Sequence, residues 1–399
     1  MNLVLQRMFS SARTYLQHLK LPGAAKQEIK QDRKGLPEYD PGIDAVLRES
    51  VAWLCRAQDQ SPDQDGGVAR HYSLLNGWGR SYPETTGYII PTLLDWAHRT
   101  GSEDARQRAK RMLDWFLRIQ LPDGGFQGGM MGAEPVQSVT FNTGQILLGL
   151  AAGVAKFGDD YRPALRKAAD WLRDTQDPDG CWRRHPTPFA KPGEKAYETH
   201  VAWGLLEAAR VEPGQDYDTA ALKNLGWALS KQQPNGWIAD CCLTYPARPL
   251  THTLGYALRG IVEGYRYFQT ENLLAAARKT ADALVSVTDS QGRLPGRLDR
   301  DWRTVTDSVC LTGSVQIAHS LLLLYGLTGE ARYRETGMAL NQFVRRTIKV
   351  QGPDEIRGAV KGSFPIDGYY GRFEYLNWAC KFMIDSNLAE RDLQQGQIR

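Results

Sequence analysis

Residues 145–154 read Gln-Ile-Leu-Leu-Gly-Leu-Ala-Ala-Gly-Val, a stretch that is apolar on nearly every side of a helix. A helix without a polar face has to be buried. Five further stretches of this kind occur, and together with the first they begin near Glu84, Asn142, Glu198, His252, Thr312 and Arg372. Successive starts lie 58, 56, 54, 60 and 60 residues apart. This regular spacing indicates an internal repeat in which neighbouring units bury one another's apolar surface.

A second kind of helix alternates with these apolar stretches. Its apolar residues recur at helical spacing on one side, as Met112, Phe116 and Ile119 do, and Arg and Lys lie between them. Such helices have one face in water and belong on the outside. Four of them are expected at residues 43–58, 104–120, 161–176 and 217–233, each followed by an Asp-Gly or Asn-Gly turn. The sequence therefore predicts an all-α (α/α)6 toroid, with six inner and six outer helices, over residues 41–390.

The connections of this predicted toroid have two lengths. Only a few residues lead from an inner to an outer helix, as at 100–103 and 326–330. About 20 residues lead from an outer to an inner helix, as at 59–83 and 177–197. Long loops inside a compact domain usually carry function. The site is therefore expected at the end of the ring where the long loops meet the first turns of the inner helices.

Those first turns and loops carry many polar and aromatic side chains. For a single threonine, capping of the helix start is the better interpretation, but capping does not account for histidines, tyrosines and arginines at the same level. A polar bowl with aromatic walls suits a sugar, because hydroxyls bond to polar groups and pyranose rings stack on flat apolar faces. For Trp182, bracing of the toroid is an equally good interpretation. The candidate substrate-binding residues are Asp65, Trp78, Arg80, Tyr88, Asn142, Trp182, Arg248, Trp302, Tyr370, Arg372 and Glu374.

Two glutamates at inner-helix starts favour glycoside hydrolysis. That reaction needs one carboxylic acid to protonate the leaving oxygen and a second carboxylate to activate water or attack the sugar. Glu84 and Glu198 begin alternate inner helices and are expected to face each other across part of the ring. Either could instead form a buried ion pair with Arg80 or Arg372. Hydrolysis by the paired glutamates is the leading hypothesis.

Histidines at the same level favour a different reaction. Removal of the C5 proton of a uronate needs a base such as His or Tyr, and a donor that stabilises the growing charge. His200 or His252 with Tyr375 would provide the base, which makes a lyase or a uronate C5-epimerase the alternative. A toroid that binds carbohydrate without catalysis is a third hypothesis. A terpenoid-binding toroid is a fourth hypothesis. A cavity lined by polar groups rather than aromatic ones would count against it.

Composition excludes several classes of protein. The 399 residues carry a formal net charge of +4 and no dense run of Lys and Arg, so nucleic acid is not an expected partner. No apolar window of roughly 18 residues exists that could span a membrane. The first residues lack the apolar run of a signal peptide and the six cysteines are scattered, so a cytoplasmic location is expected. No cofactor or metal is expected, because the vicinal pair Cys241 and Cys242 has poor chelate geometry.

The two ends of the chain differ from the repeats. Residues 1–40 are predicted to form a basic helical extension, interpreted either as a peripheral helix or as a membrane-surface contact through residues 1–34. Residues 391–399 are predicted to form a polar tail.

The repeats resemble those of known toroid families. The stretch Gln-x-x-Asp-Gly-x-Trp from Gln176 to Trp182 is similar to repeats of terpene cyclases and protein prenyltransferases, yet their Asp-x-Asp-Asp motif is missing. The whole chain more closely resembles six-hairpin carbohydrate-active enzymes, which include unsaturated glucuronyl hydrolases, polysaccharide lyases and glucuronyl C5-epimerases. Tyr-Pro-Glu-Thr-Thr-Gly-Tyr at 82–88 and Gly-Tyr-Tyr-Gly-Arg-Phe-Glu-Tyr-Leu-Asn-Trp at 368–378 look like motifs of uncharacterised proteins from bacterial exopolysaccharide gene clusters. The resemblance implies an oligosaccharide or polysaccharide substrate and transfers no catalytic residue.

Overall fold

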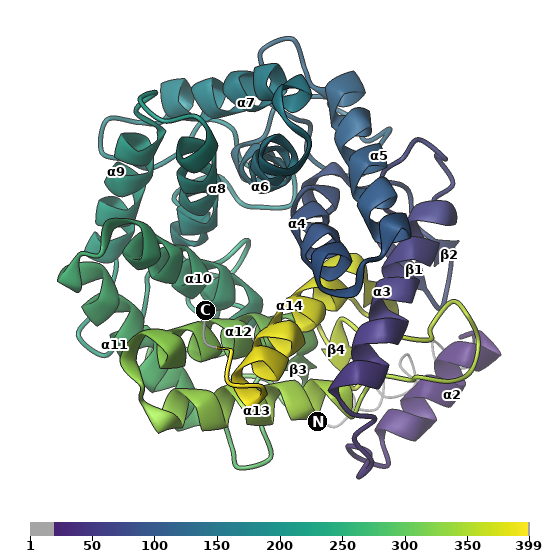
Figure 1. Cartoon of the computed structure of the whole chain (residues 1–399). Helices are drawn as coiled ribbons and strands as arrows, with labels where there is room; N and C mark the ends of the chain where they lie inside the picture. Colours follow the sequence, from purple (N-terminus) through teal and green to yellow (C-terminus); the bar gives the residue numbers. More distant parts are fainter. Residues whose placement is uncertain (1–19, 398–399) are drawn as a thin grey trace, which may run out of the picture.

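The apolar stretches that were predicted to be buried form the inner ring of a toroid with two rings of helices. The computed structural model describes residues 20–397, and Figure 1 shows the two rings seen along their common axis. In α6, nearly every residue from Thr140 to Val154 is buried, because neighbouring inner helices flank it and outer helices cover it. The inner helices are α4 (Pro83–Thr100), α6 (Thr140–Phe157), α8 (Thr199–Val211), α10 (Thr251–Phe268), α12 (Leu311–Thr328) and α14 (Asn377–Gln394).

The amphipathic helices form the outer ring. In α5, Met112, Leu113 and Phe116 are buried, and Leu113 lies against Gly153 of the inner helix α6, while Arg111 and Arg118 are exposed. The last helix, α14, packs on both α3 and α4 and so closes the ring. These observations confirm the predicted (α/α)6 toroid. The outer helices are α3 (Ile43–Asp59), α5 (Glu103–Ile119), α7 (Arg162–Thr175, preceded by η1, Asp159–Tyr161), α9 (Tyr217–Ser230), α11 (Glu271–Val287) and α13 (Ala331–Arg345).

Neighbouring inner helices approach each other through glycines. A Cβ atom on Gly204 of α8 would lie 2.4 Å from the carbonyl oxygen of Gly144 in α6. A Cβ atom on Gly149 of α6 would likewise lie 2.4 Å from the carbonyl oxygen of Gly87 in α4. Real Cβ atoms do not come this close to a backbone oxygen, so no larger residue fits without moving a helix. These glycines therefore set the spacing of the inner ring.

Short strands tie the long loops together at one end of the ring. β1 (His71–Ser73) pairs antiparallel with β2 (Gly77–Trp78) and with β5 (Glu374–Leu376), and β3 (Val309–Cys310) pairs with β4 (Ser363–Phe364). The sixth inner helix therefore begins at Asn377 and not near Arg372 as predicted, because residues 374–376 extend along β1. This pairing removes Glu374 and Tyr375 from the start of the helix.

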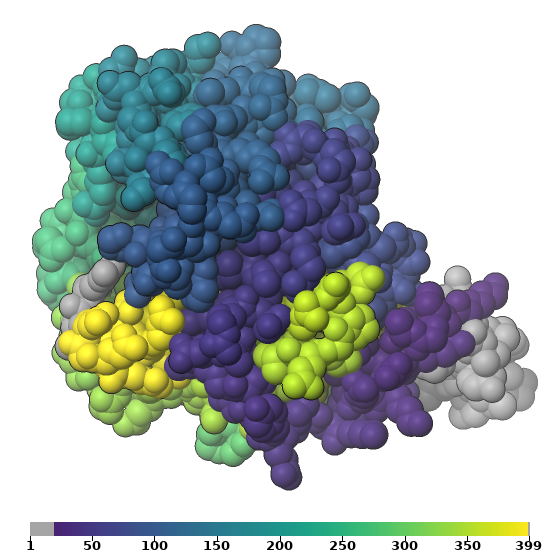
Figure 2. All heavy atoms as spheres, turned by 45° about the vertical axis from the view of Figure 1, so that its right-hand side comes forward, coloured from purple at the N-terminus to yellow at the C-terminus, as the bar shows by residue number. Residues whose placement is uncertain are grey.

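A further helix, α2 (Gly23–Asp32), packs outside the rings and contacts the last long loop. Asp32 accepts hydrogen bonds from the Lys361 ammonium at 2.5 Å and from the Ile366 N–H at 2.8 Å, and Glu28 pairs with Lys349. Figure 2 shows this purple segment lying beside a yellow-green segment from near residue 350. Two buried carboxylates thus fasten the N-terminal part of the structure to the loop that precedes β5.

The predicted ends of the toroid need one adjustment. α14 continues past residue 390 to Gln394, so part of the predicted polar tail is helical. The predicted membrane contact falls largely on residues 1–19, which lie outside the described residues. Within residues 20–397, no helix combines the length and the apolar character needed to cross a membrane.

Candidate functional site

The long loops and the first turns of the inner helices surround a cavity of about 250 Å³. It lies at the end of the ring that the loop lengths predict. Seven of its fourteen lining side chains are Phe, Tyr or Trp, so the wall is more aromatic than the predicted polar bowl. Mostly apolar walls with a few polar groups are typical of small-molecule sites. The lining residues are Arg70, Tyr82, Glu84, Met130, Phe141, Thr187, Phe189, Tyr197, Leu243, His252, Thr253, Tyr256, Tyr370 and Trp378.

Glu84 is the acidic group of this cavity. It lies in the first turn of α4, where 8% of its surface is exposed, and one carboxylate oxygen accepts a hydrogen bond from the Tyr82 hydroxyl at 2.8 Å. Burial raises the pKa of Glu84 to about 7, although the Tyr82 hydrogen bond and the Arg70 charge oppose the rise. A carboxyl with this pKa can either give or take a proton near neutral pH.

His252 lies in the first turn of α10 and lines the same cavity. Its Nδ1 lies 2.7 Å from the Gln316 side-chain oxygen, which can only accept, so Nδ1 carries the proton and Nε2 keeps a free electron pair. Burial lowers the pKa of His252 to about 4. The ring packs against Tyr256 and Tyr370. His252 is therefore a neutral hydrogen-bond acceptor at physiological pH.

Arg70 is the basic side chain among the residues that line the cavity. Its Nη1 lies 3.0 Å from a Glu374 carboxylate oxygen, and its guanidinium lies 5.0 Å from the Trp378 ring centroid. The Trp378 indole N–H donates to the Tyr370 hydroxyl at 2.8 Å. The pair with Glu374 offsets the charge of Arg70, and the guanidinium has further N–H groups that can donate to a carboxylate of a ligand.

The predicted partner of Glu84 does not share this cavity. Glu198 ends the short turn η2 (Ala196–Glu198), in which Tyr197 lines the cavity and Glu198 does not. Burial raises the pKa of the Glu198 carboxyl well above its ordinary value, and the positive charge of Lys195 opposes this rise. The two glutamates therefore do not form the expected pair across the cavity, because successive residues of the turn point in different directions.

Two of the predicted bases also lie elsewhere. His200 is fully buried in α8, with its Nδ1 2.5 Å from the Gln145 side-chain oxygen and its ring against Tyr256. Tyr375 is buried in β5, close to the carboxylates of Glu28 and Asp32 in α2. Of the five predicted catalytic residues, the cavity brings together Glu84 and His252.

The three candidate tryptophans brace the toroid. The Trp182 indole N–H donates to the Leu172 carbonyl at 2.9 Å, and the Trp302 indole N–H donates to the Asn235 carbonyl at 3.0 Å. Trp78 stacks on Trp53 of the outer helix α3. Their flat faces are used inside the protein, and none of the three lines the cavity. Tyr370 is the predicted binding residue that does line it.

The remaining predicted binding residues hold loops and helices in place. Asp65 caps a turn and accepts the Ser81 hydroxyl, Arg80 pairs with Asp63, and Asn142 donates to the Gln127 carbonyl. Arg248 and Arg372 are exposed and stack on neighbouring aromatic rings, and Glu374 pairs with Arg70. Tyr88 lies next to the cavity, since its hydroxyl is 3.3 Å from that of the lining residue Tyr256.

Most of the residues that line the cavity are not among the predicted site residues. Tyr82, Phe141 and Tyr197 each stand just before or within the first turn of an inner helix, so an aromatic residue at this repeat position is the signal that could have found them. Arg70 and Phe189 come from long loops, and nothing in the repeat pattern marks them.

The fold and the cavity define an (α/α)6 toroid with a small-molecule-sized site at the first turns of its inner helices. Residues 83–262, less than half of the chain, match the model of the squalene-hopene cyclase C-terminal domain. A copalyl diphosphate synthase from Streptomyces cyslabdanicus is 29% identical over 190 residues, which are 47% of this chain and 32% of that protein. The matched part thus spans about a third of that curated relative.

Solved structures match over nearly the whole toroid. An unsaturated glucuronyl hydrolase specific for heparin superposes with a TM-score of 0.70 at 15% identity and covers 90% of this chain and 100% of its own. A D-mannose isomerase superposes with a TM-score of 0.69 at 12% identity over 90% of this chain and 100% of its own. These likenesses agree with the observed fold and with the predicted resemblance to six-hairpin toroids. Within residues 20–397, no group of three or more His, Cys, Asp or Glu is arranged to hold a metal ion.

Proposed function

We propose that the protein is a carbohydrate-active enzyme that hydrolyses a terminal unsaturated uronate from an oligosaccharide, with Glu84 as the general acid. The observation that carries this proposal is a buried carboxyl with a pKa of about 7 in the wall of a cavity that also holds Arg70 and His252. A cavity of about 250 Å³ suits the end of a saccharide better than the middle of a polymer.

One proton donor is enough for this substrate. The C4–C5 double bond of an unsaturated uronate is an enol ether, so the Glu84 carboxyl can protonate C4 while the ring oxygen stabilises the cation at C5. Water held by the free Nε2 of His252 then adds to C5 and gives a proton to the Glu84 carboxylate. The hemiketal opens, C1 becomes a hemiacetal, and the hemiacetal expels the rest of the saccharide. Hydrolysis of an ordinary glycoside would need a second carboxyl, and Glu84 is the carboxyl that lines the cavity.

Absorbance of the unsaturated-uronate chromophore tests this proposal. With unsaturated disaccharides we expect the absorbance to fall as the double bond is consumed. A rise in absorbance on saturated uronate polymers would instead indicate elimination and would overturn the proposal. Binding of the disaccharides without any product would favour a carbohydrate-binding toroid.

Substitution of Arg70 tests the choice of an acidic sugar. We expect Arg70→Gln to raise KM for the unsaturated uronate by about tenfold or more, because a charge-assisted bond to the substrate carboxylate is lost. Arg70→Lys keeps the charge and should recover part of the affinity. Steady-state kinetics on the free acid and its methyl ester give the comparison. An equal loss for both substrates would argue against a contact between Arg70 and the carboxylate.

The pH dependence follows from the two cavity groups. Glu84 must be protonated to act as an acid, so kcat/KM should fall as the pH rises through about 7. His252 must be neutral to hold water, so kcat/KM should fall again as the pH drops through about 4. A profile of kcat/KM against pH, measured in buffers of constant ionic strength, checks the fall on each side. A profile that stays flat from pH 6 to 9 would contradict the role of Glu84.

A second candidate is proton transfer without bond cleavage, as in an epimerase or isomerase. The observation that favours it is again Glu84, since a carboxyl with a pKa of about 7 is partly ionised at neutral pH and can act as a base. One of the structural neighbours is a D-mannose isomerase. Deuterium uptake from solvent into a recovered sugar, with no new reducing ends, would distinguish this reaction from hydrolysis.

The aromatic wall of the cavity would suit an isoprenoid substrate, but the acid strength of Glu84 would not. The sequence matches to isoprenoid cyclases and the seven aromatic side chains would favour such a ligand. Cyclisation that starts by protonation of an isolated double bond needs a strong acid, whereas burial makes Glu84 a weaker acid than a free glutamate. An enol ether accepts a proton far more readily, and for this reason we favour the sugar.

A further inference from the structure

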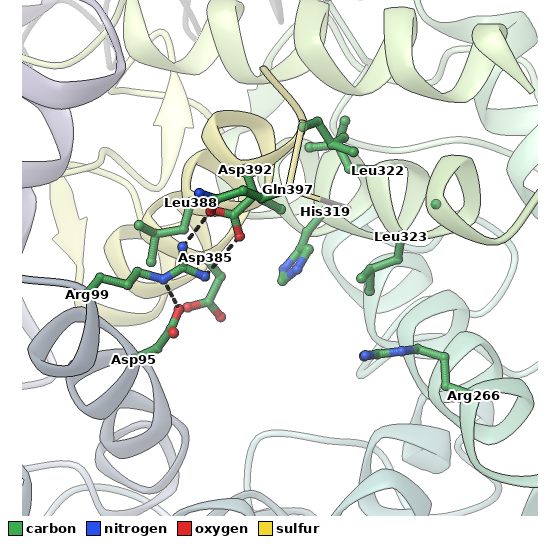
Figure 3. Close-up of a pocket in the computed structure, with 13 residues that line it drawn as sticks. Asp95, Arg99, Arg266, His319, Leu322, Leu323, Asp385, Leu388, Asp392 and Gln397 are labelled. Carbon is green, nitrogen blue, oxygen red and sulfur yellow. Dashed lines mark hydrogen bonds and ion pairs between the residues drawn. The ribbon is translucent and has the colours of Figure 1, made fainter. Parts of the chain in front are cut away.

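A second pocket lies at the opposite end of the ring, where the inner helices end. It has a volume of about 180 Å³ and is bordered by α4, α10, α12 and α14 (Figure 3). The candidate active site lies at the first turns of the inner helices, and the two sets of lining residues have no member in common. The second pocket is therefore a separate feature of the toroid.

One wall of this pocket has more negative than positive charge. Arg99 is shared by two carboxylates: its Nε bonds Asp95 at 2.8 Å, and its two Nη atoms bond Asp392 at 2.6 and 2.9 Å. Asp95 is the more accessible of the two, with 36% of its side chain exposed against 10% for Asp392. A third carboxylate, Asp385, is neutralised by Lys381 at 2.6 Å. Two carboxylates for one guanidinium leave this wall with an excess of one negative charge.

The facing wall has the reverse arrangement. The buried carboxylate of Glu263 is shared by two guanidiniums, Arg259 at 2.7 Å and Arg266 at 3.0 Å. Arg259 also donates to Nδ1 of His319 at 2.9 Å, so His319 carries its proton on Nε2. Figure 3 shows the His319 ring and the Arg266 side chain directed into the open space, across from Asp95 and Arg99.

The electrostatic field at His319 agrees with an excess of positive charge on this wall. Its pKa is lowered well below the ordinary value by burial first, and then by the charges of Arg259, Lys381 and Arg266. His319 therefore stays neutral and offers an N–H donor beside a wall with one excess positive charge. Apolar side chains also line the pocket: Leu322 and Leu323 come from α12 with His319, and Leu388 comes from α14 with Asp392.

We infer that this pocket binds a small zwitterion, with its ammonium at Asp95 and its carboxylate or phosphate at Arg266 and His319. A ligand with one charge would satisfy one wall and leave the other uncompensated. A molecule with both charges matches both walls, and the leucines can contact its uncharged part. An α-amino acid and a phosphorylated amino sugar share this chemistry.

Calorimetric titration of the full-length protein tests this inference. The probes are leucine and glucosamine 6-phosphate, each compared with analogues that lack one charge: N-acetyl-leucine and leucinamide, and N-acetylglucosamine 6-phosphate and glucosamine. We expect one of the two zwitterions to bind at least tenfold more tightly than its single-charge analogues. The zwitterion that binds identifies the source of the ligand. Failure of both zwitterions to bind, or equal binding of the analogues, would overturn the inference.

Matched variants place the ligand in the pocket. Asp95→Asn and Arg266→Gln alter side chains that are 36% and 39% exposed, so the fold should survive both. Each should weaken binding of the zwitterion by about tenfold. Arg106→Gln changes a cation of the outer helix α5 that is 38% exposed, pairs with Glu103 and does not line the pocket, so binding should remain unchanged. Glu84→Gln should also retain binding, whereas loss in that variant would place the ligand in the active-site cavity and overturn the inference.

Discussion

Glu84→Gln is expected to lower kcat on an unsaturated uronate by roughly a hundredfold to ten-thousandfold, the usual contribution of a general acid. The substitution keeps the size of the side chain and one oxygen that can accept the Tyr82 hydrogen bond. It removes the acidic proton, and with it the group whose pKa burial raises to about 7. Substrate binding should change much less, because an uncharged amide resembles a protonated carboxyl. Steady-state kinetics and calorimetric binding measure the two effects separately.

Glu198→Gln is the matched control. Glu198 is as deeply buried as Glu84 and also has a raised pKa, but it does not line the cavity. We expect activity within a few-fold of the unchanged protein. Equal and large losses in both variants would restore the paired-glutamate mechanism that the sequence suggested. Unchanged activity of the Glu84→Gln variant would contradict the proposed function.

Gly204→Ala is expected to destabilise the toroid by about 1–3 kcal/mol, the usual cost of overpacking a core. The added methyl would lie 2.4 Å from the carbonyl oxygen of Gly144 on the neighbouring inner helix. Backbone atoms cannot swing aside as a side-chain tip can, so α6 and α8 would have to separate. Alanine favours a helix over glycine by about 1 kcal/mol, and the clash has to exceed this gain. Urea denaturation measures the difference in the free energy of unfolding.

Gly226→Ala makes the same chemical change on the outer helix α9. Nothing lies within 4 Å of a Cβ atom placed there. We expect this variant to be more stable by up to about 1 kcal/mol, because the helix preference acts alone. Destabilisation of the same size at both glycines would show that close packing of the inner ring is not the cause.

The repeat pattern was sufficient to predict the rings but not the position of every functional side chain. The spacing of apolar stretches depends on which helices are buried, and the inner helices from α4 to α12 begin within a few residues of the predicted starts. The last inner helix starts five residues later than residue 372 because β5 pairs with β1, a contact between residues some 300 positions apart that no local pattern reveals.

The site residues were harder to predict, because whether a residue lines the cavity depends on the direction in which its side chain points. Tyr197 and Glu198 are neighbours in a single turn, yet one lines the cavity and the other does not. His200 and His252 occupy equivalent places in their repeats, and both bond a glutamine, but only His252 lines the cavity. Such differences arise from the exact rotation of each helix, which is fixed by packing across the whole ring.

The most direct test of the central claim is to carry out the reaction with an unsaturated uronyl disaccharide in deuterium oxide and to analyse the product by NMR and mass spectrometry. We predict loss of the chromophore, entry of deuterium at C4 of the released uronate, and neither change with Glu84→Gln. A chromophore that persists while deuterium enters the sugar, or a saturated uronate that gains the chromophore, would contradict the role assigned to Glu84.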